Sequence, residues 1–142
     1  MPSAADLILA DPSEAPTIVA SDYPLGTFKG VNIDGLDPLK LAALHSLLVH
    51  KPFGDVLRDY RPIGQASPEG PWLIRLPDEL IAFLGKIAPP DQASVAAMWA
   101  STDQVQEEGW SQDNADQFLA RLVPLAQSAS FEGKDLFLWI YN

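Results

Sequence analysis

The chain has 142 residues, the size of one ordinary domain, of which 47% are hydrophobic and 20% are charged. At this length folding buries roughly 68–70% of the surface of the unfolded chain, so no disulfide or metal is needed for stability. The formal net charge is −10, which disfavours nucleic acids and anionic membranes as partners, because both are bound through clustered Lys and Arg. The composition therefore favours a globular protein that binds neither.

The chain contains no cysteine, which removes disulfides, thiolate metal sites and cysteine nucleophiles together. Its start, MPSAADLILADPSEAP, has no positive charge and only the short apolar run LILA, so it lacks the pattern of a secretory signal. The longest apolar runs, such as LFLWIY, are far shorter than the ~20 residues that a membrane helix needs. We therefore expect a cytoplasmic protein without a membrane-spanning segment.

Two strands and a helix are predicted for the first third of the chain. Residues 1–16 mix prolines with small and acidic residues, so we expect a loosely ordered start, followed by a strand near residues 17–20. The sequence TFKGVNID at residues 27–34 predicts a second strand. The sequence DPLKLAALHSLLVHK predicts a helix with Asp37 as N-cap and Pro38 at its first position, since a missing N–H costs nothing there.

The middle of the chain predicts alternating helices and strands. We expect a short helix at residues 53–60, a turn-rich loop at residues 61–71, a strand at WLIRL and a helix that starts at Pro77. A further helix is predicted over DQASVAAMWASTDQV. Its core-facing side is expected to contain Val95, Met98, Trp99, Thr102 and Val105.

The last third of the chain predicts a long helix and a buried strand. Gly109 is expected to end the preceding helix, and Ser111 to cap a helix from Gln112 to about Phe131. After Gly133, the sequence DLFLWIYN predicts a central strand covered on both faces. Together these elements predict a single compact α+β domain over residues 1–142, with four or five helices packed on a small mixed sheet.

No short motif for catalysis, a cofactor or a metal is present. The only histidines, His45 and His50, lie about 140° apart around a helix, so they cannot easily share a metal. Asp78 and Glu79 suit the positive end of a helix better than a catalytic pair. The acidic run at residues 113–116 lacks the spacing of a calcium loop, and no phosphate-binding glycine loop occurs. We therefore predict no catalytic, cofactor-binding or metal-binding residues.

The charge distribution is strongly uneven, because no Lys or Arg occurs between Lys86 and Arg121. Within that interval, STDQVQEEGWSQDNADQF places a tryptophan among carboxylates, as expected of a surface that binds a basic protein. Trp110 is interpreted either as a staple between two helices or as an exposed interface anchor. The predicted partner-binding residues are Asp103, Glu107, Glu108, Trp110, Asp113 and Asp116.

Two alternatives stay open. In the first, the protein binds a small ligand or is an enzyme, with a site in a cleft beside residues 58–71. That site would use Arg58, Tyr60, Arg61 and Glu69. In the second, the chain is a subunit of an oligomer whose acidic surface only maintains solubility. The sequence predicts no particular oligomeric state.

Three segments carry a resemblance to known proteins. GPWLIRLPDEL, VAAMWASTDQVQEEGW and GKDLFLWIYN resemble the recurring skeleton of small, uncharacterised bacterial proteins, over roughly residues 70–142. At the level of class, a small, acidic, cysteine-free protein is also similar to the immunity proteins that neutralise bacterial toxins. This resemblance implies a non-catalytic protein that occludes the active site of a basic toxin, and it brings no catalytic residues with it.

Overall fold

A five-stranded antiparallel sheet runs through the computed structural model, which describes residues 4–141. The strands are β1 (Ala4–Ala10), β2 (Lys29–Asn32), β3 (Gly64–Gln65), β4 (Trp72–Arg75) and β5 (Asp135–Tyr141). Their order in the sheet is β2-β1-β5-β4-β3. The predicted α+β class is confirmed, although every strand pair is antiparallel and the sheet is not mixed.

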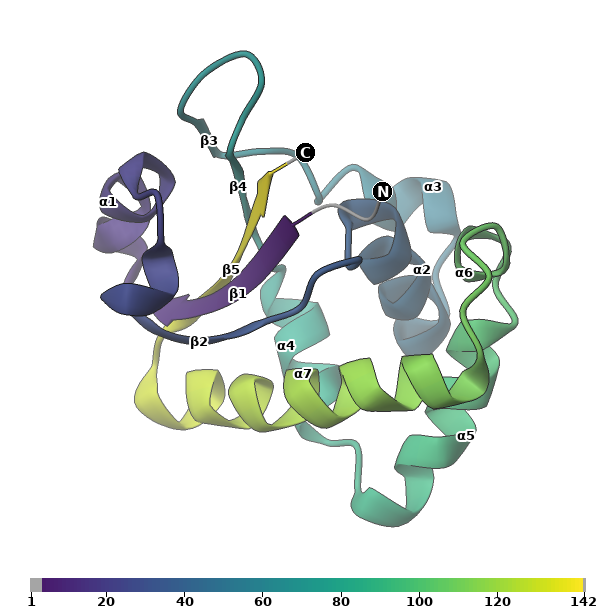
Figure 1. Ribbon diagram of the computed structural model, residues 1–142. Coiled ribbons are helices and arrows are strands. Elements are labelled where there is room, and N and C mark those ends of the chain that lie inside the picture. The colour runs from purple at the N-terminus through teal and green to yellow at the C-terminus, as the bar shows by residue number, and fades with distance from the viewer. Residues whose placement is uncertain (1–3, 142) are drawn as a thin grey trace.

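Helices cover both faces of the sheet unequally. In the described residues they are α1 (Ala15–Ala20), α2 (Pro38–Val49), α3 (Phe53–Leu57), α4 (Asp78–Gly85), α5 (Pro89–Ala100), α6 (Asp103–Gln106) and α7 (Gln112–Glu132). Two 3-10 turns, η1 (Pro12–Glu14) and η2 (Pro24–Gly26), flank α1. Figure 1 shows α1 on one side of the sheet and α2 to α7 on the other. Within residues 4–141 no helix combines the length and apolar character needed to cross a bilayer.

The start of the chain differs from the prediction. Residues 4–16, expected to be loosely ordered, form β1, η1 and the first turn of α1, and residues 17–20, expected to be a strand, are helical. The cause is tertiary: β1 pairs with β5 along its whole length and with β2 on its other side. Both faces of β1 are also covered, since Leu7 and Leu9 lie in one core cluster and Ile8 and Ala10 in the other. A strand buried in this way has a short apolar run without alternation as its signal.

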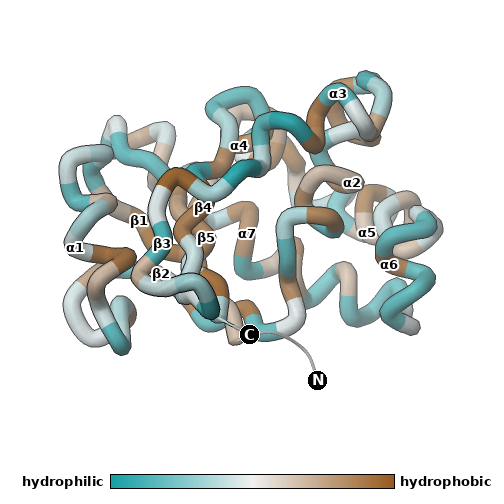
Figure 2. The backbone as a smooth tube through the Cα atoms, turned by 90° about the horizontal axis from the view of Figure 1, so that it is seen from above, coloured by the Kyte–Doolittle hydropathy of each residue, from teal (hydrophilic) through white to brown (hydrophobic). Residues whose placement is uncertain are grey.

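The central strand β5 divides the core into two clusters. Leu136, Leu138 and Ile140 point to the larger cluster, beneath the helices, while Phe137 and Trp139 point to the smaller one, beneath α1. The predicted central strand with both faces covered is therefore confirmed. Figure 2 shows hydrophobic residues following one another along β4 and β5.

Helix caps follow the sequence signals closely. The Asp37 side chain accepts a hydrogen bond from the Lys40 amide at the start of α2, and Ser111 caps α7 in the same way. Gly133 ends α7 in the left-handed conformation, with φ of 67°. These three predicted caps are confirmed, and each satisfies backbone groups that a helix end leaves free.

The predicted helix over residues 91–105 is confirmed up to Ala100 and is then interrupted, because the chain turns between α5 and α6. The helix α5 ends at Ala100, and Thr102 adopts an extended conformation before α6 begins. Its hydroxyl donates to the Trp99 carbonyl at 2.7 Å, a local bond that competes with helix continuation. Of the predicted core-facing residues, Val95, Trp99 and Val105 are buried, whereas Met98 is 52% exposed.

Candidate functional site

The predicted partner-binding residues lie in one continuous part of the fold, at the opposite side of the molecule from α1 (Figure 1). This part comprises α6, the connection that follows it and the first turns of α7, and we call it the acidic segment, residues 103–116. Asp103 is the first residue of α6, Glu107 follows its end, and Asp113 is in the first turn of α7. Gly109 turns the chain between the two helices with φ of 72°, a value that favours glycine.

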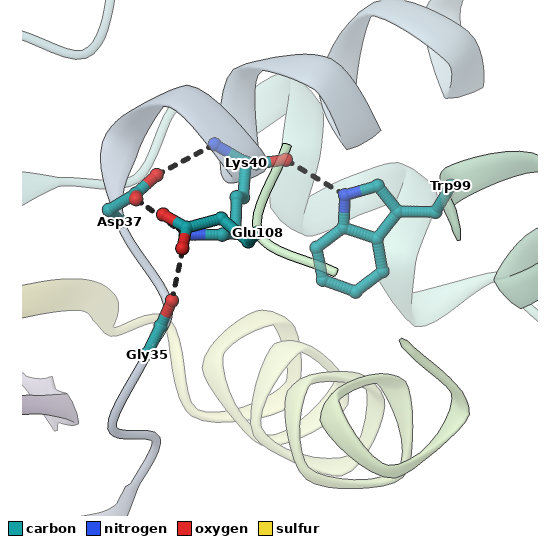
Figure 3. A network of polar contacts seen from close by, with 5 residues as sticks. All are labelled: Gly35, Asp37, Lys40, Trp99 and Glu108. Carbon is teal, nitrogen blue, oxygen red and sulfur yellow. Dashed lines mark hydrogen bonds and ion pairs between the residues drawn. The ribbon is translucent and has the colours of Figure 1, made fainter. Parts of the chain in front are cut away.

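A buried lysine anchors the acidic segment to α2, as Figure 3 shows. Lys40 is 2% exposed, and its ammonium group donates to Glu108 Oε1 at 3.1 Å, to Asp37 Oδ2 at 2.6 Å and to the Gly35 carbonyl at 3.0 Å. These three acceptors use all three N–H groups of the lysine. Although no Lys or Arg occurs between Lys86 and Arg121 in the sequence, Lys40 of α2 supplies a compensating positive charge to Glu108.

Trp110 packs against the core and holds the connection between α6 and α7. Its ring stacks on Phe118 with centroids 4.3 Å apart and an interplanar angle of 8°. It also meets Trp99 edge to face, with ring centroids 5.5 Å apart, and Lys40 Nζ lies 5.2 Å from its ring centroid. Of the two interpretations of Trp110, the geometry corresponds to the staple, because its ring is half-buried and already engaged.

The carboxylates of the acidic segment fall into two groups. Glu108 pairs with Lys40, and Asp116 accepts a hydrogen bond from the Gln92 side chain of α5 at 3.1 Å. Asp103, Glu107 and Asp113 are exposed and form no ion pair or side-chain hydrogen bond with any other residue in the part of the chain that the structure describes. The first group fastens the segment to the fold, and the second leaves its charge available to solvent or a partner.

A second polar cluster joins α2, α4 and the chain after α3. Buried His45 lies between the Tyr60 hydroxyl, at 2.9 Å from Nδ1, and Glu79 Oε1, at 2.8 Å from Nε2. Lys51 Nζ pairs with the other oxygen of Glu79 at 2.9 Å. In the neutral tautomer with the proton on Nε2, His45 donates to the ionised Glu79 carboxylate, and Nδ1 accepts from the Tyr60 hydroxyl.

The chain from Glu79 through His45 to Tyr60 has the order of a carboxylate, an imidazole and a hydroxyl, as in nucleophilic enzymes. Burial raises the pKa of the Tyr60 hydroxyl far above its ordinary value, and the nearby charges of Asp59 and Glu79 act in the same direction. A phenol that keeps its proton so firmly is a hydrogen-bond donor and a poor nucleophile. The contacts of Glu79, His45 and Tyr60 join α4, α2 and the chain after α3, and we call this cluster the clamp.

Replacement of Glu79 with glutamine tests this clamp. The hydrogen bond from His45, together with Lys51, lowers the pKa of the Glu79 carboxyl below its ordinary value of 4.5. A lowered pKa in the folded state means that the carboxylate stabilises the fold above that ordinary value and loses this effect as the pH falls through the folded-state pKa. We expect Glu79→Gln to destabilise the protein at pH 7 and to destabilise it less at a pH well below 4.5, where the wild-type carboxylate begins to take up its proton. Urea unfolding at both pH values measures it, and an equal loss at both would contradict the account.

A hollow of about 260 Å³ opens beside the loop at residues 61–71. Its lining is almost entirely apolar and consists of Pro38, Tyr60, Pro62, Trp72, Ile74 and Ile140. Of the residues proposed for a small-ligand site, only Tyr60 lines it, while Arg58, Arg61 and Glu69 are exposed. The structure thus places a hollow where the alternative interpretation expected a cleft, but lines it with groups suited to apolar contact.

No group of three or more His, Asp or Glu side chains within residues 4–141 is arranged to hold a metal ion. Comparisons with protein-family models, with curated proteins and with solved structures each return no match. The geometry of the acidic segment therefore carries the functional interpretation. Sequence reasoning missed Lys40, which is 68 residues from Glu108 and has no local signal beyond a lysine inside an apolar helical stripe.

Proposed function

We propose that the protein is a non-catalytic binding module whose acidic segment associates with a basic protein partner. One observation carries this proposal: three exposed carboxylates, on Asp103, Glu107 and Asp113, stand on a segment that the fold already holds in place. Lys40 and Trp110 supply that support through the contacts described above. Because the segment is ordered before binding, association loses less conformational entropy than it would for a flexible acidic loop.

The charge of the segment sets the expected kinetics. Attraction between an acidic and a basic surface mainly raises the association rate, and it is screened beyond a Debye length of about 8 Å at physiological ionic strength. The partner is expected to carry clustered Lys or Arg side chains. Those cations would pair with the carboxylates that have no partner among residues 4–141, and the net charge of −10 adds long-range attraction.

A finer proposal names the partner as a bacterial toxin whose active site this protein covers, in the manner of an immunity protein. This proposal is supported by a resemblance in composition, because the chain, like immunity proteins, is small, acidic and free of cysteine. The absence of cysteine also fits an encounter with the toxin in the reducing cytoplasm. Cells producing a cognate toxin should survive when they also produce this protein. Survival should be lost with the charge-reversed variant described next, and protection by that variant would contradict the finer proposal.

Charge reversal at Glu107 and Asp113 tests the binding surface. Both side chains are exposed and lack internal partners in the described chain, so the double variant Glu107→Lys, Asp113→Lys is expected to fold normally. Glu108 is left unchanged, because a lysine there would meet the buried Lys40. The matched control, Asp22→Lys with Glu69→Lys, changes the net charge equally at exposed positions outside the segment.

Affinity capture with the three tagged proteins is done at low and moderate salt in extracts of cells that make the protein. We expect wild type and control to retain one stoichiometric basic protein, which the Glu107→Lys, Asp113→Lys protein loses. Retention by all three proteins, or loss from the control and the variant alike, would show that the acidic segment is not the binding surface. Capture of no basic protein by the wild type at either salt concentration would contradict the proposal itself.

The hollow beside residues 61–71 favours a second candidate, the binding of a small apolar or aromatic ligand. Trp72 and Ile74 line the hollow from β4, and Ile140 lines it from β5. A panel of aromatic compounds should raise the melting temperature of the wild type and not of Trp72→Ala. Ligands whose effect requires Arg61 would instead indicate the exposed side of the loop, and no effect across the panel would remove this candidate.

A further inference from the structure

The helix α4 has an exposed stripe whose charges are arranged symmetrically. Asp78 begins the helix, Lys86 follows its last residue, and Ala82 lies midway between them, four residues from each. All three side chains are exposed, and spacing of four residues places them along one side of a helix. Phe83 lies next to this stripe and is 39% exposed. The stripe therefore has a negative end, a small centre and a positive end.

Two hollows flank the centre of this stripe and lie between α4 and α7. Both are lined by Ala82 and Ser130. The hollow of about 460 Å³ also contains Lys86 and Phe131, and the hollow of about 310 Å³ contains Asp78. Phe131 is 92% exposed, the highest value among the exposed large hydrophobic side chains of the described chain. An exposed phenylalanine beside an open hollow is a feature of interaction surfaces.

We propose that this surface binds a second copy of the same chain, with a twofold axis close to Ala82. When two copies of α4 pack antiparallel about that axis, Asp78 of each copy meets Lys86 of the other. A twofold interface requires this kind of self-complementarity, because residue i of one copy contacts residue j of the other and the reverse. The alanine at the centre lets the helix axes approach closely, and Phe131 packs across the interface onto the partner.

Charges around the stripe are largely neutralised within each copy. Arg75 donates to Asp135 at 2.7 Å and to one oxygen of Asp78 at 2.7 Å, which leaves the other oxygen of Asp78 for the second copy. Lys134, in the smaller hollow, has Glu132 at 3.8 Å. Lys86 Nζ lies 5.7 Å from the ring centroid of Phe83 and forms no ion pair within residues 4–141, so it can still pair with a carboxylate of the second copy.

The dimer would leave the acidic segments well apart. Asp113 and Phe131 lie near opposite ends of the 21-residue helix α7, roughly 27 Å from each other at 1.5 Å per residue. Asp113 is therefore more than three Debye lengths of about 8 Å from Phe131 of its own chain, so its charge acts only weakly at the proposed contact. The dimer proposal is independent of the proposed function, since it uses the other end of α7.

Sedimentation equilibrium over a range of protein concentrations tests the proposal with charge-reversed variants. Lys86→Asp and Asp78→Lys should each raise the dimer dissociation constant by roughly tenfold or more, because like charges then meet twice across the axis. An equimolar mixture of the two variants should restore association, because the two lysines on the stripe of one chain would face the two aspartates on the stripe of the other. Arg58→Asp reverses an exposed cation on another surface and should dimerise as the wild type does.

Several results would overturn the proposal. A wild type that stays monomeric up to several hundred micromolar would exclude the dimer. If the mixture of the two variants stayed as monomeric as each variant alone while all of them kept wild-type circular dichroism, the proposed pairing would be wrong. Ala82→Arg adds a check that does not depend on the ends of α4: it should prevent dimerisation, and unchanged association would place the interface elsewhere. Loss of dimerisation leaves capture through the acidic segment unaffected, so the two proposals fail separately.

Discussion

Replacing Lys40 with methionine is expected to lower the free energy of unfolding by about 3 kcal/mol. This value is at the lower end of the ~3–5 kcal/mol lost when one member of a buried ion pair is removed. The lower end applies because Asp37 and Glu108 retain 25% and 54% side-chain exposure and can be rehydrated. Methionine preserves the apolar stem of the lysine, so the loss reports on the ammonium group and its three acceptors.

Urea unfolding of Lys40→Met, Glu108→Gln and the double variant measures how much of this stability loss depends on the ion pair between Lys40 and Glu108. Glu108→Gln should cost less than Lys40→Met, and its cost should nearly vanish in the Lys40→Met background, because the two groups act as a pair. Lys29→Met, at a side chain 61% exposed, should change stability by less than about 0.5 kcal/mol. Strictly additive losses would contradict the pairing.

Truncation of Trp99 to alanine is expected to cost about 3–5 kcal/mol, the range for a large aromatic side chain removed from a core. Trp99 is fully buried, and its indole N–H donates to the Lys40 carbonyl at 2.9 Å. Trp99→Phe should cost less, since it keeps most of the packing and loses the hydrogen bond. The truncation also removes one neighbour of Trp110, so the acidic segment should lose order.

Two measurements check the Trp99 prediction. Urea unfolding gives the stability loss, with Met98→Ala as control, since Met98 is the exposed neighbour in the same helix. Hydrogen exchange is the second measurement. Relative to the wild type, Trp99→Ala should accelerate amide exchange more at residues 103–112 than in the distant strand β1. Uniform acceleration over the whole chain would mean that Trp99 supports the core without a specific role in the acidic segment.

Local signals predicted the elements whose ends are set by a single side chain or by a glycine. Asp37, Ser111 and Gly133 each fulfil the capping role that their position indicates. The prediction failed where distant pairing decided the structure. The strand β1 forms because β5, more than a hundred residues later, supplies its partner, and its apolar run resembles no isolated strand pattern.

The acidic segment shows the same limit at the level of the site. Its carboxylates and its tryptophan could be identified from the sequence, and the structure places them together on α6 and the start of α7. The division of these carboxylates into anchored and free groups could not be identified from the sequence, because Lys40 contacts Glu108 from α2 and Gln92 contacts Asp116 from α5. A contact between side chains far apart in the chain leaves no pattern in either local stretch.

This division also changes how the surface should be tested. Reversal of Glu107 and Glu108 together would mix a surface effect with the loss of the Lys40 pair, so any decrease in binding would be ambiguous. The variant with Glu107 and Asp113 reversed avoids that ambiguity, because both side chains point into solvent and neither has an internal partner within the described residues.

The most direct test of the central claim is the association rate of the captured basic partner, measured at several salt concentrations. With the wild type and with the control Asp22→Lys, Glu69→Lys, the rate should fall steeply as salt rises. With Glu107→Lys, Asp113→Lys, it should be lower by roughly tenfold at low salt and nearly independent of salt. Equal rates and equal salt dependence for all three proteins would show that the acidic segment does not recruit the partner.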